Sequence, residues 1–304
     1  MLTRRRFMTI TATALALGAT RAGATPRQVW AGQALGARAS IRLDHPDAAA
    51  IAARAANEIS RLSRIFSLYE PTSQLVQLNQ TGRLDGPAPE LLECLTLAGA
   101  VHDASGGLFD PTIQPLWALW AERVSMGLQP TAAELAEARG RGGWSDLRLD
   151  AAAITLRPGM GLTLNGIAQG YIADRIAALL SEEGLTNILI DTGEHRALGQ
   201  MPEGRPWPVT LAQGGSVPLR DRALATSAPL GTVFDAEGRF GHILHPATGA
   251  PATVRWSGIS ISAPRAGLAD ALSTAACLAA DRRAIDAILA AFPEATCLSA
   301  RQAA

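Results

Sequence analysis

The sequence predicts an α+β fold, because helix-like and strand-like segments follow one another without a regular βαβ alternation. Residues 46–67 carry apolar side chains at helical spacing, whereas short runs such as residues 187–191 indicate strands. Hydrophobic residues make up 48% of the 304-residue chain, which is enough for a sizeable core and argues against disorder. No repeat or linker divides residues 25–304, so we expect one domain there.

The order of the elements follows from periodicity and from end signals. Helices are predicted in residues 46–67, 88–104, 131–140, 165 to about 183, and 267–280. Strands are predicted as a pair within residues 28–43, and then in 147–150, 153–157, 161–165, 187–191 and 207–212. Turn residues separate the three runs between 147 and 165, which favours an antiparallel meander. Residues 216–263 are rich in strands and turns, and a final helix and strand are expected within 282–299.

The first 24 residues are typical of an export signal. A cluster of arginines, Arg4 to Arg6, precedes Phe7 and Met8, and an apolar run follows that is too short to span a membrane. The segment ends on a small-residue pattern, so we expect cleavage near Ala24. Paired arginines before x-Phe-Met indicate a twin-arginine signal, which exports folded proteins, and the expected location is the periplasm.

The charge balance excludes several classes of function. Four of the 27 arginines lie in the expected signal, which leaves 23 basic residues against 27 acidic ones, a net charge of about −4. A mature chain of that sign carries no electrostatic footprint for nucleic acid. The chain contains no lysine, which excludes a lysine Schiff base and a phosphate-loop lysine.

The three cysteines, Cys94, Cys277 and Cys297, are widely spaced and odd in number. One pair could form a disulfide in an oxidising compartment, but we expect buried free thiols. After the signal, no segment is long and apolar enough to predict a transmembrane helix.

Residues that could carry chemistry gather at a few element boundaries, although no common catalytic motif is present. Asp110 follows the Gly106-Gly107 pair that ends a predicted helix, and the Asp110-Pro111 pair is also a common turn former. The stretch NGIAQGYIADR, residues 165–175, starts a helix with Asn165 as the expected cap. Its glycines permit either close approach of an anion to the helix start or tight packing of a neighbouring element.

Two further clusters supply hydroxyls, a histidine and a carboxylate. Thr226 and Ser227 could hold a phosphate and His242 could transfer a proton near neutral pH, although a hairpin with polar turns fits equally well. Asp270 and Thr274 lie four residues apart and therefore share one helix face. Oxygen ligands on one face suit a hard cation such as Mg2+, but such a pair is common by itself.

Taken in order, these clusters resemble the ApbE family of FAD:protein FMN transferases. The stretches that carry the resemblance are FSLYEPTSQLVQLN, GGLFDPTIQPLWALW, NGIAQGYIADR, GLTNILIDTGE, ALATSAPLG, GHILHPATGAP and LADALSTA. The resemblance implies an α+β fold with mixed or antiparallel sheets flanked by helices, related to the T-fold, with FAD in a central cleft. It also implies Mg2+-dependent transfer of FMN from FAD to a threonine or serine hydroxyl of an acceptor protein, with release of AMP.

The resemblance assigns roles by matching positions. It implies a metal site of Asp270, Thr274 and the backbone carbonyl of Ala168, with Asp270 and His242 as catalytic residues. His242 would assist proton transfer from the acceptor hydroxyl. The cofactor would contact His242 and nine further residues: Tyr69, Ser73, Asn79, Asp110, Thr112, Gln169, Asp174, Thr226 and Ser227.

Departures from the family pattern point to one branch. Gln169 stands where lysine is common, Ala37 replaces a threonine, and Glu194-His195 stands where members often have Gly-Asp. The Gln169 form, the GEHRALG stretch and the signal resemble the periplasmic NosX branch, which implies a NosR-like membrane acceptor in nitrous oxide reductase maturation. Two alternatives are a non-enzymatic periplasmic FAD-binding or flavin-donor protein and an FAD hydrolase with water as acceptor.

Overall fold

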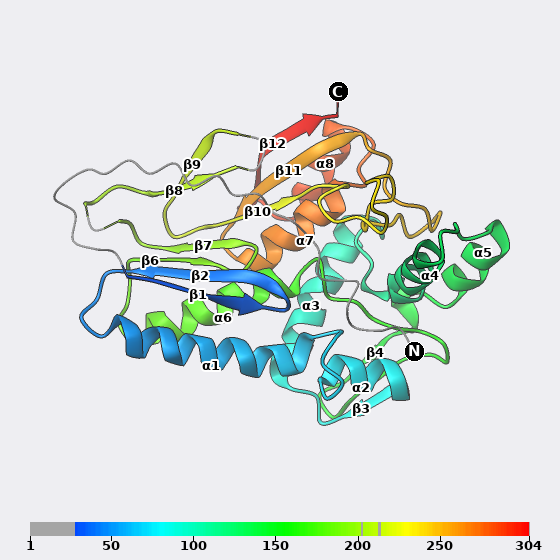
Figure 1. Ribbon diagram of the computed structural model, residues 1–304, viewed down its shortest axis with the longest axis horizontal. Helices are drawn as coiled ribbons and strands as arrows, with labels where there is room; N and C mark the ends of the chain where they lie inside the picture. The colour runs from blue at the N-terminus through cyan, green and yellow to red at the C-terminus, as the bar shows by residue number, and fades with distance from the viewer. Residues whose placement is uncertain (1–27, 202, 212–213, 304) are drawn as a thin grey trace.

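The computed structural model describes residues 28–201, 203–211 and 214–303, and its centre is a seven-stranded antiparallel sheet (Figure 1). The strand order is β1, β2, β6, β7, β10, β11, β12, and each neighbouring pair is antiparallel. The strands are β1 (Gln28–Ala34), β2 (Ala37–Leu43), β6 (Ile188–Asp191), β7 (His195–Leu198), β10 (Ala223–Ser227), β11 (Trp256–Ala263) and β12 (Thr296–Gln302). With the helices this confirms the predicted α+β class.

Five helices surround the main hydrophobic core. They are α1 (Ala48–Phe66), α3 (Pro89–Ala104), α6 (Ala168–Glu182), α7 (Ala266–Ala276) and α8 (Arg282–Leu289). α1 contacts β1, α6 contacts β6 and β7, and α7 contacts β10 and β11, whereas α3 packs on α7 and α1. In Figure 1, α1 and α6 lie together below β1 and β2. The predicted helices in these segments are confirmed, with boundaries that differ by a few residues.

The remaining elements lie outside this sheet. Strands β3 (Arg83–Asp85), β5 (Ala153–Thr155) and β4 (Arg148–Leu149) form a small sheet, and β8 (Trp207–Thr210) pairs with β9 (Ser216–Leu219). The other helices are α2 (Gln74–Thr81), α4 (Gln114–Ser125) and α5 (Ala132–Gly140). Sequence analysis missed α2 and α4. α2 is too short for a clear periodicity, and α4 begins in a proline-containing segment that favours a turn.

Two local predictions were wrong. Residues 161–165 do not form the third strand of a meander, because β5 pairs with β3 instead. The Asn79 amide binds both the N–H and the carbonyl of Leu162, at 2.7 and 2.8 Å, and so takes the place of a strand partner. Asn165 does not cap α6, whose N-cap residue is Ile167. Tertiary contacts thus determine how the chain enters this helix.

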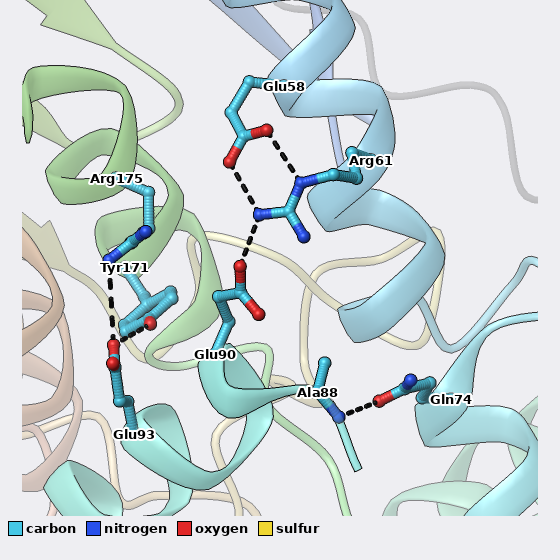
Figure 2. A network of polar contacts seen from close by, with 8 residues as sticks. All are labelled: Glu58, Arg61, Gln74, Ala88, Glu90, Glu93, Tyr171 and Arg175. Carbon is cyan, nitrogen blue, oxygen red and sulfur yellow. Dashed lines mark hydrogen bonds and ion pairs between the residues drawn. The ribbon is translucent and has the colours of Figure 1, made fainter. Parts of the chain in front are cut away.

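A polar network joins the helices on which the site depends (Figure 2). Arg61 of α1 binds Glu58 in its own helix and Glu90 of α3, at 2.7 and 2.5 Å. The hydroxyl of Tyr171, in the first turns of α6, donates to Glu93 of α3 at 2.5 Å. This network fixes α6 against α3 close to the point where α6 begins.

The cysteine prediction is confirmed: Cys94, Cys277 and Cys297 are free and buried. Burial raises the pKa of the Cys277 thiol to about 12, so this thiol is unreactive near neutral pH. No helix among the described residues has the length and apolar character needed to cross a bilayer. The expected export signal lies outside the described residues.

Candidate functional site

One cavity of about 620 Å3 brings together residues from every cluster that the sequence singled out. Its walls include part of the α6 start, the end of β10, the loop that carries His242, and one face of α7. Seven predicted site residues line it: Asp110, Gln169, Thr226, Ser227, His242, Asp270 and Thr274. Apolar side chains, among them Phe109, Trp117 and Ile243, complete the lining. An apolar cavity with a few converging polar groups is typical of a small-molecule site.

Asp270 is the buried carboxylate on the α7 wall and is only 4% exposed. The backbone N–H of Gly170 donates to its Oδ2 at 3.3 Å. Burial raises the pKa of Asp270 to about 7, and the Gly170 hydrogen bond offsets only part of that effect. The start of α6 therefore directs an N–H at an internal carboxylate, whereas one of the two interpretations that the sequence left open was an external anion.

A chain of hydroxyls continues from Asp270 along α7. Ser227 at the end of β10 lies 2.6 Å from the hydroxyl of Ser273 and 3.3 Å from that of Thr274. A Cβ atom at Gly166 would lie 3.0 Å from the Thr274 hydroxyl, so glycine keeps this hydroxyl accessible. Thr226 instead turns its hydroxyl to Ser260, at 2.8 Å.

His242 faces the same cavity from the loop between β10 and β11. Its Nδ1 lies 2.9 Å from the carbonyl oxygen of Thr232. Because a carbonyl can only accept, Nδ1 carries the proton and Nε2 of the neutral ring remains a proton acceptor. Burial lowers the pKa of His242, which keeps the ring neutral at neutral pH.

Glu194, which sequence analysis did not predict as a site residue, also lines the cavity. It is 8% exposed, and its Oε2 accepts the N–H of Thr226 at 3.1 Å. Burial raises the pKa of Glu194, and the nearby charge of Asp270 raises it further. The sequence did mark Glu194 as a position where this chain departs from the family pattern. Such a departure does not indicate which way the side chain points.

Four residues predicted to contact the cofactor do not line this cavity and instead bind other protein groups. Ser73 is fully buried and caps α2, and Asn79 binds the backbone of Leu162. Thr112 is also fully buried, where it binds Asp110 and the N–H of Gly143.

Asp174, the fourth of these residues, contacts the start of α7. Its carboxylate accepts the N–H groups of Ala266 and Gly267, at 2.8 and 3.0 Å, and lies 3.4 Å from Arg196. It therefore holds the start of α7, the helix that carries Asp270. A sequence motif alone cannot distinguish a residue that touches a ligand from one that positions such a residue.

Two other predicted residues lie beside the cavity. Tyr69 is 65% exposed and its hydroxyl bonds to the side chain of Asn165, which does line the cavity. Ala168, the first residue of α6, is 1% exposed and does not line the cavity, but its neighbour Gln169 does. The backbone carbonyl of Gln169 accepts the hydroxyl of Thr192 at 2.8 Å.

The donor atoms at Asp270 fit a hard cation. Among described residues, no hydrogen bond reaches Oδ1 of Asp270, a residue that lines the cavity. The Thr274 hydroxyl stands one helical turn along the same face. Within the described ranges no three His, Cys, Asp or Glu side chains meet at one point, so hydroxyls, backbone carbonyls or a bound ligand would complete the coordination.

Comparisons with known proteins agree with this arrangement. A family model described as the ApbE family matches residues 35–298. The chain is 30% identical to an FAD:protein FMN transferase of Treponema pallidum, over 75% of this chain and 71% of the relative. It is 27% identical to the Haemophilus influenzae protein of that name, over 73% and 70% of the two chains.

Solved structures share the fold. The ApbE protein of Thermotoga maritima superposes with a TM-score of 0.79 at 25% identity, covering 91% of this chain and 97% of the other. The flavinyl transferase ApbE of Pseudomonas stutzeri, in its apo form, gives a TM-score of 0.76 at 23% identity, covering 86% and 87%.

Proposed function

Because the chain belongs to the ApbE family, we propose that it is a flavin transferase that moves FMN from FAD to a hydroxyl of an acceptor protein. The observation that carries the proposal is the convergence of Asp270, Thr274, Ser227 and His242 on one cavity. The cavity offers an apolar wall for a flavin and an oxygen-rich floor at α7 for the diphosphate and its counter-ion.

The proposed reaction is a displacement at phosphorus. A threonine or serine hydroxyl oxygen of the acceptor bonds to the FMN phosphorus, and the bond from that phosphorus to the bridging oxygen breaks, so that AMP leaves with the bridging oxygen. His242 accepts the hydroxyl proton at Nε2, and its Nδ1–H bond to Thr232 fixes the ring orientation. Such reactions depend mainly on positioning and charge neutralisation.

We propose Mg2+ as the counter-ion, held by Asp270, Thr274 and the Ala168 carbonyl. A bound Mg2+ would supply the positive charge that neutralises the diphosphate oxygens. Ser227 orients the Thr274 hydroxyl through their mutual hydrogen bond, and Gly166 leaves that hydroxyl uncovered. The Gly170 N–H holds Asp270 toward the start of α6.

We further propose that the protein is exported to the periplasm and that its acceptor is an exported or membrane-bound protein. The NosX-like features of the sequence point to a NosR-like protein as this acceptor. The twin-arginine pattern around Arg5 and the small residues before Ala24 support the location. Fractionation of cells with and without an Arg4-Arg5 to Lys-Lys replacement tests it. Retention of the unprocessed chain in the cytoplasm of the variant is expected, and unchanged export would contradict the proposal.

The transfer reaction is tested with the purified mature chain, FAD, Mg2+ and a threonine-bearing acceptor domain. We expect an FMN mass increment on the acceptor and one AMP for each acceptor modified, with loss of both in Asp270→Asn. AMP release without an acceptor would favour FAD hydrolysis. Tight FAD binding with no product, unchanged in Asp270→Asn, would favour a flavin-donor protein instead.

A further inference from the structure

Glu194 places a second buried carboxylate in the cavity that holds Asp270. The two residues are 8% and 4% exposed, and both line the cavity. In the part of the chain that the structure describes, no arginine or histidine lies within ion-pair distance of either carboxylate. Two like charges buried together each disfavour the other, so the pair needs a cation or a proton.

Each carboxylate has one oxygen that accepts a backbone N–H and one that accepts no hydrogen bond from the described residues. Glu194 Oε2 accepts the Thr226 N–H at 3.1 Å, and Asp270 Oδ2 accepts the Gly170 N–H at 3.3 Å. Across the described ranges, Oε1 of Glu194 and Oδ1 of Asp270 accept no hydrogen bond. Both oxygens belong to residues that line the cavity, so they are available to a ligand that binds there.

The chain that carries Glu194 is held against the start of α6. The hydroxyl of Thr192 donates to the carbonyl of Gln169 at 2.8 Å. Gly193 adopts a φ of +104°, where a Cβ atom would lie 3.0 Å from the Gln169 side chain. Since Gly170 of the same helix start binds Asp270, one backbone segment positions both carboxylates.

We propose that Glu194 is a further ligand of the cation at Asp270, binding through Oε1, so that the cation lies between two carboxylates. The inference rests on the proposed function, because it takes the Asp270–Thr274 pair as the cation site. The alternative is a purely structural role, in which Glu194 only accepts the hydrogen bond from the Thr226 N–H and so holds β10 in place. The two roles differ in whether the negative charge of Glu194 matters.

Mn2+ titration followed by electron paramagnetic resonance separates these roles, with FAD present and with FAD absent. Glu194→Gln keeps an oxygen for the Thr226 N–H and removes the charge. We expect the Kd for Mn2+ to rise at least about ten-fold in Glu194→Gln and in Asp270→Asn. Glu194→Asp keeps the charge and should bind Mn2+ more tightly than Glu194→Gln. The control is Glu294→Gln, an exposed site with the same chemical change, which should bind like the wild type.

The outcomes are distinguishable. Wild-type affinity in Glu194→Gln together with weak binding in Asp270→Asn would overturn the second-ligand proposal and leave the cation site intact. Wild-type affinity in both variants, or no Mn2+ binding by the wild type under either condition, would overturn the proposed cation site as well. Thermal unfolding of each variant verifies that it is folded.

Discussion

Asp270 and His242 face one cavity, and burial displaces their pKa values in opposite directions. The pKa of Asp270 rises to about 7 and that of His242 falls, because a buried site disfavours the charged form of either group. Near pH 7 the cavity thus offers a neutral imidazole as proton acceptor beside a carboxyl group that a cation would keep ionised. Acid and base roles are separated by environment as much as by residue type.

The first prediction concerns His242 as the proton acceptor. Because its pKa is lowered, the neutral ring persists below the ordinary histidine pKa of about 6.5, and the acidic limb of the rate profile should lie below that value. His242→Gln should lower the transfer rate about 10²- to 10⁴-fold and remove this limb. Single-turnover rates at several pH values measure both effects. A variant that keeps the limb would assign it to another group.

The second prediction concerns Asp270 and stability without cation. When folding raises the pKa of an acid, the protonated acid stabilises the folded state at pH values below the unfolded pKa, which is near 3.8 for Asp270. This stabilisation is lost as the pH rises through the folded-state pKa of about 7. Metal-free wild-type protein should therefore lose stability from pH 5 to pH 8 more steeply than Asp270→Asn does. Urea denaturation in chelator at each pH checks this. Equal slopes would show that the carboxyl group is solvated.

At the scale of elements, the site depends on how closely α6 crosses the start of α7. A Cβ atom at Gly170 would lie 2.3 Å from the carbonyl oxygen of Ala266, a backbone atom that cannot move aside. The absent side chain also leaves the Gly170 N–H close to Asp270. The sequence left two interpretations open for this glycine, approach of an anion and tight packing of a neighbouring element. The structure supports tight packing.

The third prediction follows from this contact. Gly170→Ala should reduce the free energy of unfolding by about 1–3 kcal/mol, because overpacking against backbone exceeds the gain in helix propensity. Chemical denaturation measures it. Gly140→Ala in α5 is the matched control, since, apart from its chain neighbours and the helix backbone, no described residue places an atom within 4 Å of a Cβ there. Equal stability of the two variants would contradict this prediction, because it would mean that α6 and α7 can move apart at little cost in free energy.

The fourth prediction separates support from contact at Asp174. Asp174→Asn should destabilise the fold by about 1–3 kcal/mol, because one of the N–H groups of Ala266 and Gly267 loses its acceptor. The folded variant should bind FAD with nearly the wild-type Kd, since Asp174 does not line the cavity. Fluorescence titration with FAD tests this. A large loss of affinity at unchanged stability would instead support the predicted contact between Asp174 and the cofactor.

At the scale of the whole molecule, the antiparallel sheet places β7, β10 and β11 side by side although residues 195–263 include long connections (Figure 1). α6 and α7 pack on this part of the sheet and on each other. The cavity forms where the start of α6 and one face of α7 meet the loop that carries His242. Ligands that bridge these segments should therefore stabilise the entire fold.

The fifth prediction is a linkage between ligand binding and unfolding. FAD and Mg2+ at about one hundred times their dissociation constants should each add about 2.7 kcal/mol to the free energy of unfolding. In Asp270→Asn the Mg2+-dependent part should vanish, while the FAD-dependent part decreases less. Differential scanning fluorimetry with each ligand alone and together measures both parts. A Mg2+ shift that persists in Asp270→Asn would place the cation elsewhere.

The sequence by itself determined the α+β class, most helices and strands, and the residues of the cavity that belong to contiguous motifs. Periodicity predicted the elements because burial on one face imposes it. The Asp270–Thr274 pair could be found because four residues along a helix always share a face.

Only the tertiary structure decided which polar residues face the cavity. Asp174 and Asn79 lie in motifs, yet they bind backbone groups brought to them by distant segments. Glu194 lines the same cavity as Asp270 because the chain after β6 docks on the start of α6, a contact that no local pattern encodes. The direction of a side chain depends on packing between elements, whereas the elements themselves depend largely on the local sequence.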